Sequence, residues 1–356
     1  MSQSHIHNCN AKSRYLTFVI RNLLLTVLLC CSTSAICFSQ NEDSIARIMF
    51  YNVENLFDVY DDSLKNDNEF LPAGERQWTY KRMMQKFASI SHVILNAGGW
   101  NMPVIVGLCE VENRWVLSAL LRETGLETLG YRVVHHDSPD ERGIDAALIY
   151  NSARFNVIAS RPCAINLGKG ERPTRDILYV KGILQQTDTL HILVNHWSSR
   201  LGGTVASRPK REKAAAVLKS VCDSIVVNCP CANIIMMGDF NEEPESDIMT
   251  NIVKSGSVDA GLPFINLGLY ANGNDGTLKY QHTWTVFDQI MVSRTLTESM
   301  RVGLKQPVQQ IIALPFLLEA DPVYGGQRTA RTYTGFKYAG GFSDHLPVMI
   351  ELLIRK

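Results

Sequence analysis

The chain has no excess charge of either sign and little that would hold it in a membrane. Its 356 residues contain 35 lysines and arginines against 35 aspartates and glutamates. This balance excludes the strongly basic footprint that by itself marks a nucleic-acid binder. With 46% hydrophobic and 20% charged residues, the composition is that of a globular chain, and it excludes disorder, collagen, a coiled coil and a polytopic membrane protein.

The short motifs of several enzyme classes are also absent. The sequence has no GxSxG elbow and no P-loop, which excludes the usual serine hydrolase and nucleotide triphosphatase sites. It has no CxxC pair or His/Cys cluster of the kind that holds structural zinc. Of nine cysteines, four lie in the first 39 residues. The remaining five are an odd number, so at least one stays free or pairs between chains, and Cys222 with Cys229 or Cys231 is the pair close in sequence.

The N-terminal segment has the layout of a secretory signal. Three basic residues and no acidic residue precede or flank a short apolar run at residues 23–31, and small residues follow it. This pattern predicts a signal peptide over residues 1–39, cleaved after Ser39. The apolar run is too short to span a bilayer. Two alternatives remain open: acylation on Cys30, Cys31 or Cys37, and a permanent N-terminal anchor.

Removal of this signal leaves residues 40–356, which we expect to form one catalytic domain because no repeat or linker divides them. The signal takes away three basic and no acidic residues, so the mature chain has a formal charge of −3. We expect an exported protein, periplasmic or extracellular, without stable membrane insertion after signal removal. Nothing in the sequence implies a protein partner.

Strand and helix patterns alternate along this mature chain. A chain of this kind is expected to form a single α/β domain of two packed sheets with outer helices. Residues 58–78 and 270–338 are polar or poorly patterned and read as long loops. Strands are predicted at residues 45–51, 103–109, 131–135, 144–150, 155–165, 177–184, 190–194, 233–237 and 346–354, and helices at 80–95, 115–129 and 210–226.

Polar residues gather where these apolar runs end, which is where α/β sheets build their sites. Each of these residues alone could close a turn, cap a helix or be a hydrogen-bonded core group. A buried set of Glu, Asp, Asn and His, however, costs several kcal/mol unless a cation or a charge network compensates it. Such oxygen donors suit Mg²⁺ or Mn²⁺. The ends are Asn52–Asn55, Glu110–Glu112, Asn195–His196, Asp239–Asn241 and Ser343–His345, with Asp288 as a weaker sixth.

In order and spacing, these motifs resemble the endonuclease/exonuclease/phosphatase superfamily, and the Asn52-Val53-Glu54-Asn55-Leu56-Phe57 motif is most similar to that of secreted bacterial nucleases. The resemblance covers roughly residues 45–354. It implies the DNase I-like fold, a four-layer α/β sandwich in which two packed mixed β-sheets are flanked by helices. It also implies Mg²⁺-dependent hydrolysis of phosphoesters by an activated water.

Carried over residue by residue, the resemblance assigns roles to the predicted site. Glu110 would be the main metal carboxylate, assisted by Asn52 and by Asp344. Asp239 and Asn241 would position the attacking water and the phosphate, with Asp239 a candidate general base. His345 would contact the scissile phosphate and be oriented by Asp288, and His196 would act as general acid or phosphate-oxygen donor. Two departures are that Gln289, not an aromatic residue, follows Asp288, and that no tyrosine matches the family's phosphate-contacting tyrosine.

For substrate binding, we expect three arginines to contribute. Arg175 is the substitute for the missing tyrosine, with a surface turn at Arg175-Asp176 as the alternative. Arg200 and Arg208 belong to a cationic segment after His196, which also contains Lys210 and Arg211 and which could bind flanking phosphates. The alternative is a solvated loop and helix face.

The sequence therefore predicts an exported, Mg²⁺- or Mn²⁺-dependent nuclease that hydrolyses phosphodiester bonds of DNA, or of RNA, with nucleic acid as its substrate. The alternative within the same chemistry is a phosphatase or phospholipase C-like enzyme acting on inositol phosphates or sphingomyelin. A non-catalytic binding module on the same scaffold would be expected to have lost a core residue. None is missing from the set Asn52, Glu110, Asp239, Asn241, Asp344 and His345.

Overall fold

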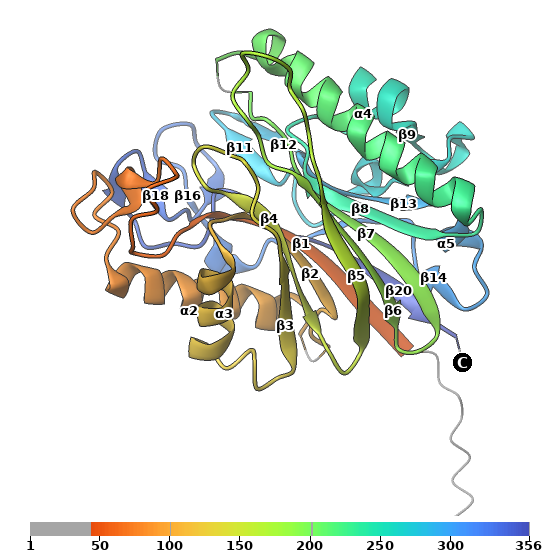
Figure 1. Cartoon of the computed structure of the whole chain (residues 1–356). Coiled ribbons are helices and arrows are strands. Elements are labelled where there is room, and N and C mark those ends of the chain that lie inside the picture. The colour runs from red at the N-terminus through yellow and green to blue at the C-terminus, as the bar shows by residue number, and fades with distance from the viewer. Residues whose placement is uncertain (1–43, 100, 201, 356) are drawn as a thin grey trace, which may run out of the picture. The chain divides into compact units, whose positions relative to one another are not determined.

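Two seven-stranded mixed sheets pack face to face in the computed structural model, which describes residues 44–99, 101–200 and 202–355 (Figure 1). The predicted signal peptide, residues 1–39, lies outside the described residues, as does the start of the predicted catalytic domain. No helix in the described ranges is both long and apolar enough to cross a membrane.

The first sheet is centred on the parallel pair β1 and β2, with antiparallel neighbours on both sides. Apolar residues fill these central strands almost continuously, as expected for strands buried on both faces. Its order is β14 (Val302–Leu304), β20 (Val348–Ile354), β1 (Ser44–Leu56), β2 (Ile105–Val111), β4 (Asp145–Asn151) and β3 (Tyr131–His135), with β15 (Gln310–Ile311) also paired to β20.

The second sheet repeats this plan around the parallel pair β7 and β8. Consequently, both central pairs end at an edge where an antiparallel neighbour begins. Its order is β5 (Phe155–Cys163), β6 (Ile177–Leu184), β7 (Asp188–His196), β8 (Asn233–Asp239), β13 (Asp288–Ser293), β10 (Phe264–Asn266) and β9 (Ser255–Gly256).

Helices cover the outer faces of the two sheets (Figure 1). Helix α2 (Tyr80–Ala97) and helix α3 (Arg114–Glu123) pack on the first sheet, and helix α4 (Thr204–Asn228) packs on the second. Between the sheets, Gly107 permits a close approach, because a Cβ there would lie 2.5 Å from the Met237 sulfur. The four layers confirm the predicted DNase I-like sandwich.

The region that the sequence left unpatterned, residues 270–338, consists of short elements and of one core strand, β13. Asp288 therefore begins a strand instead of following one, and His345 likewise precedes β20. Besides β14 and β15, the short elements of this region are η4 (Leu267–Tyr270) at its start, β11 (Leu278–Tyr280), β12 (Thr283–Thr285), α5 (Thr295–Glu298), η5 (Pro315–Leu317), β16 (Leu318–Ala320), β17 (Gln327–Thr329), β18 (Tyr333–Thr334) and β19 (Lys337–Tyr338). Three further short helices lie outside this region: η1 (Asn68–Phe70), η2 (Ile248–Val253) and η3 (Val258–Ala260).

Most other predicted elements agree with the structure to within a few residues. Two predicted helices differ by six residues at one end. The helix predicted at 115–129 is α3, which ends at Glu123 before Gly125 with its φ of 77°, and the helix predicted at 210–226 is α4, which already begins at Thr204. The five cysteines of the described residues are all free, and Cys229 and Cys231 are exposed.

Candidate active site

Six polar side chains from six strands or strand ends meet at one edge of the sandwich. We refer to Asn52, Glu110, His196, Asp239, Asp288 and His345 as the carboxylate cluster. Asn52, Glu110, His196 and Asp239 lie in the last part of β1, β2, β7 and β8. Asp288 begins the antiparallel neighbour β13, and His345 lies just before the antiparallel neighbour β20. The antiparallel strands β13 and β20 thus begin at the same edge of the sandwich at which the parallel strands end.

Register explains why three of these side chains share one face of the second sheet. His196 on β7 and Asp288 on β13 both pair directly with Asp239 on β8, and residues opposite each other on neighbouring strands point to the same side. The His196 Nε2 atom lies 3.9 Å from Asp239 Oδ2. The His345 Nε2 atom lies 3.8 Å from the same oxygen.

Asn52 links the two sheets. Its amide nitrogen donates to Asp239 Oδ2 at 3.2 Å and to Glu110 Oε1 at 3.4 Å, while its side-chain oxygen accepts from the Glu54 amide at 3.0 Å. Asn52 is fully buried. The predicted pairing of Asn52 with Glu110 is therefore present, with Asp239 as the third member.

Glu110 is held by the backbone of the neighbouring strand end. Its Oε2 atom accepts from the Asn55 amide at 3.0 Å, and Oε1 lies 3.8 Å from His196 Nε2. The backbone of Glu110 is left-handed, with a φ of 61°, and so are those of Glu54, Asn55 and Asn241. Pairing between β1 and β2 shifts register at this point. Left-handed non-glycine residues are costly and gather at functional sites.

The two histidines occupy opposite electrostatic environments. Burial alone would lower the pKa of His345, but Asp288 and Asp239 outweigh it and hold that pKa well above its usual value. The His345 Nδ1 atom is 2.7 Å from Asp288 Oδ2, so the predicted partner of this ring is in contact with it. The pKa of His196 is instead held well below its usual value by burial and by the nearby Arg175 and Arg142. These opposite pKa shifts favour the charged form of His345 and the neutral form of His196.

Asp239 is the acid most affected by burial in this cluster. Burial raises its pKa to about 7, against the opposing effect of His345. Its Oδ1 atom accepts from the Asn241 amide at 3.0 Å. Asn241 in turn donates through Nδ2 to the Trp197 carbonyl at 3.2 Å. The predicted pair Asp239 and Asn241 is therefore a single hydrogen-bonded unit at the end of β8.

The Asp344 side chain contacts residues outside the carboxylate cluster. Arg331 donates to its carboxylate at 2.9 Å and to that of the buried Glu54 at 3.1 Å. The buried ammonium of Lys86 donates to Thr332 Oγ1 and to the Phe342 carbonyl, each at 2.5 Å. We refer to Glu54, Lys86, Arg331 and Asp344 as the salt-bridge cluster. A metal-ligand role for Asp344 stays a prediction, while its carboxylate is paired with Arg331.

Sequence reasoning missed this second cluster because no local pattern marks it. Glu54 stood inside the recognised motif, but Lys86 occupies a core position of α2, and Arg331 comes from the unpatterned region. Burial lowers the pKa of Lys86 to about 8, although Glu54 and Asp344 oppose this effect. A buried lysine among apolar helix positions is the one signal that could have been noticed.

The three predicted substrate arginines have different fates. Arg175 is buried; it donates to the Trp197 carbonyl at 3.0 Å and faces Asp140 at 3.4 Å, so the surface-turn alternative is wrong. Arg200 donates to the Asn241 carbonyl at 2.9 Å and stacks on Phe287. Arg208 is about half exposed and pairs with Glu212 and Asp247, so its substrate contact stays a prediction.

Arg211 does not belong to an exposed cationic patch. It is fully buried, and its Nε atom donates to Glu242 Oε1 at 2.5 Å. Further donations to Ser207 Oγ and the Thr204 carbonyl tie the first turns of α4 to that same position. Arg211 is therefore a structural residue.

The carboxylate cluster fits a hard divalent cation by its donor chemistry. Its charged oxygens are those of Glu110, Asp239 and Asp288, and no thiol is among its members. Mg²⁺ is typically held by one or two carboxylates and keeps several waters, and Glu110 offers a carboxylate of this kind. The Asn52 oxygen accepts from the Glu54 amide, so the Asn52 nitrogen, not its oxygen, faces Glu110 in this structure. Among the residues that the structure describes, a more compact ligand group, His135 with Asp137 and Asp145, lies on β3, β4 and the loop between them. There the His135 Nε2 atom is 3.2 Å from Asp145.

Comparisons with known proteins match the fold of this chain. A family model described as "Endonuclease/Exonuclease/phosphatase family" matches residues 47–354. No curated protein matches the chain in sequence. Among solved structures, an endonuclease/exonuclease/phosphatase family protein from Bacteroides thetaiotaomicron is similar, with a TM-score of 0.55 and 14% identity over 88% of this chain and 99% of that one.

Two eukaryotic structures have the same fold. Truncated TDP2 from Caenorhabditis elegans has a TM-score of 0.51 at 14% identity, over 87% of this chain and 98% of that one. The human Nocturnin catalytic domain with bound sulfate anion has a TM-score of 0.53 at 16% identity, over 87% and 97%. At such identities, the likeness shows the fold alone.

Proposed function

This chain belongs to the endonuclease/exonuclease/phosphatase family, whose members are generally phosphoester hydrolases, and from that premise we propose that it is an exported, Mg²⁺- or Mn²⁺-dependent nuclease. The observation that carries the proposed chemistry is the carboxylate cluster, in which oxygen donors from both sheets face a charged and a neutral histidine. The signal-like residues 1–39 support export.

The residues divide the work of phosphodiester hydrolysis among them. Glu110, next to Asn52, would hold the cation, which when bound neutralises charge on the phosphate oxygens. Asp239, kept in place by the Asn241 amide, is positioned to accept a proton from an attacking water. Asn241 adds a neutral side chain beside the same acid.

The histidines would donate hydrogen bonds to the phosphate and its leaving group. The imidazolium of His345, fixed by Asp288 at 2.7 Å, can donate a charge-assisted hydrogen bond to an oxygen on which negative charge develops. The neutral His196 offers Nε2 toward the cluster, since this atom faces Glu110 and Asp239. It can donate one hydrogen bond and does not add a second positive charge.

Plasmid nicking with and without EDTA tests the proposal. It is run beside phosphate release from inositol phosphates and phosphocholine release from sphingomyelin. We expect nicking that EDTA abolishes and that His345→Ala reduces at least about hundredfold. Hydrolysis of the lipid or inositol substrate without nicking would assign the alternative activity, and wild-type nicking by both His345→Ala and Glu110→Ala would overturn the site.

A further inference from the structure

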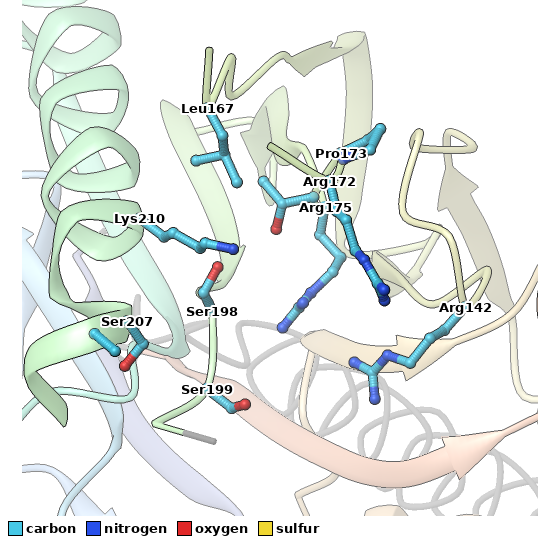
Figure 2. A pocket seen from close by; sticks show the side chains of 11 residues that line it. Arg142, Leu167, Arg172, Pro173, Arg175, Ser198, Ser199, Ser207 and Lys210 are labelled. Carbon is cyan, nitrogen blue, oxygen red and sulfur yellow. The ribbon is translucent and has the colours of Figure 1, made fainter. Parts of the chain in front are cut away.

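A cationic cavity of about 430 Å³ opens beside the carboxylate cluster. Its cations are Arg142, Arg172, Arg175 and Lys210, and none of its described lining residues is acidic. Figure 2 shows the three arginines extending from one side and Lys210 from helix α4 on the other, toward the same space. Its volume is within the range of small-ligand sites. Neither its cations nor its serines belong to the carboxylate cluster.

The Trp197 carbonyl joins this cavity to the active site. It accepts from the Arg175 guanidinium at 3.0 Å on the cavity side and from Asn241 Nδ2 at 3.2 Å on the other side. Ser198 and Ser199, which line the cavity, directly follow Trp197 and lie two and three residues after His196. A ligand group in the cavity is thus one short chain segment away from the cluster.

Arg175 is the buried cation in the wall of this cavity. More than nine-tenths of its side chain is buried, and two of its nitrogens have partners, in Trp197 and Asp140. Its Nε–H has no hydrogen-bond partner. A buried, unpaired donor on a charged group is costly. The Arg175 side chain lines the cavity, so an anion there would be a charge partner for its guanidinium.

The start of helix α4 adds a second attraction for an anion. Helix α4 spans 25 residues, its N-cap Gly203 supplies no capping side chain, and its first turn contains no acid. Ala206 and Ser207 of that first part line the cavity. Free amides and the positive end of the helix dipole favour negative charge there.

The acids near the rim do not close the cavity. Glu141 lies 3.5 Å from Arg172, and Glu171 lies 3.0 Å from Lys210. Arg172 is largely solvent-exposed, both glutamates are about half exposed and Lys210 is about one-third exposed. Surface pairs of this kind contribute little. They can open when a phosphate group arrives.

We propose that this cavity binds a second phosphate group of the substrate while the scissile phosphodiester lies at the carboxylate cluster. The proposal rests on the proposed function and narrows it. The preferred substrate is a phosphodiester with another phosphate close to the scissile one. An otherwise identical diester without that phosphate is a poorer substrate.

Thymidine dinucleotides test the proposal, because TpT, pTpT and TpTp share one scissile bond and differ in a terminal phosphate. Binding is measured in EDTA, without turnover, and kcat/KM is measured with Mg²⁺. We expect pTpT or TpTp to bind about tenfold tighter than TpT, the size of one charge-assisted contact, with the kinetic advantage in KM. The trinucleotide TpTpT shows whether an internal phosphate serves equally.

The matched variant is Arg172→Gln combined with Lys210→Gln, which leaves the buried Arg175 intact. We expect it to reduce the binding advantage to less than about twofold. Lys219→Gln, farther along the same helix, is the control and should keep the full advantage. Equal binding of TpT, pTpT and TpTp by the wild type, or an unchanged advantage in the double variant, would overturn the proposal. A binding preference without turnover of any of these nucleotides would support the cavity and count against the nuclease function.

Discussion

Strand β1 contributes to two clusters of buried or partly buried polar side chains that differ in charge balance. In the salt-bridge cluster, the carboxylates of Glu54 and Asp344 face the cations of Lys86 and Arg331. In the carboxylate cluster, three carboxylates face one charged histidine, His345, since the pKa of His196 is lowered. A buried charge that lacks a partner is costly. The balanced cluster is therefore compensated within the chain, whereas the carboxylate cluster has more acids than cations, as the proposed cation site would need.

The largest effect on activity should follow from Glu110→Gln, which removes one of the three carboxylates in the carboxylate cluster. We expect kcat/KM to fall about a thousandfold or more, because several kcal/mol of charge stabilisation are lost. The melting temperature should stay the same or rise, since like-charge repulsion falls.

Glu112→Gln is the matched control, two residues away. Burial raises the pKa of Glu112 to about 8, so it is largely protonated at pH 7 and glutamine is nearly isosteric and isoelectronic with it. Activity should change less than about threefold. Equal losses in the two variants would show that local packing, and not the charge of Glu110, supports activity.

A smaller loss is expected from Asp288→Asn. The amide can still touch the His345 ring but no longer stabilises its charged form, so we expect kcat/KM to fall about hundredfold. Steady-state kinetics with a circular dichroism check of folding measures this. Unchanged activity would mean that His345 does not act as the charged donor.

The salt-bridge cluster should make the free energy of unfolding depend on pH through Lys86. The pKa of Lys86 is about 8 in the folded state and 10.5 in its usual range. Between these values the unfolded chain holds a proton that the folded chain has lost, so the Lys86 contribution to the free energy of unfolding rises with pH by about 3 kcal/mol. It is flat below pH 8.

Lys86→Met removes this titration. The difference in free energy of unfolding between wild type and variant, measured by urea titration from pH 7 to 10, should therefore grow with pH. A pH-independent difference would contradict a depressed lysine pKa.

The smallest effect concerns the cation itself. Mg²⁺ at ten times its Kd should stabilise the folded wild type by about 1.4 kcal/mol, seen as a rise in melting temperature. Glu110→Gln should lose this rise, whereas Asp137→Asn in the His135 group should keep it. If Asp137→Asn lost the rise and Glu110→Gln kept it, the cation would be assigned to the His135 group instead.

The two clusters also differ in how far the sequence could predict them. Strand ends are local features, so Asn52, Glu110, His196 and Asp239 could be predicted to share an edge. Asp288 and His345 were also expected at strand ends, but Asp288 begins β13 and His345 precedes β20. Their arrival at that edge depends on antiparallel pairing with β8 and β1, which no local pattern reveals. The resemblance to the family supplied what periodicity did not.

Side-chain pairs that are far apart in the sequence could not be predicted from it. Arg331 meets Glu54 across 277 positions, and Lys86 meets Thr332 across 246. For the same reason Arg211, predicted in an exposed patch, is instead buried against Glu242. Charge patterns along a helix show which residues are cationic, but not which of them find a buried acid.

The left-handed backbone of Glu110 and Asn241 has a consequence for how this chain can change. At such positions glycine has the lowest conformational cost, by about 1 kcal/mol. Glu110→Gly would therefore relieve local strain and at the same time delete the carboxylate. Stability and chemistry make opposite demands on this residue. A lineage selected for folding alone would lose its hydrolytic activity first at these strand ends, while the sandwich beneath them remained intact.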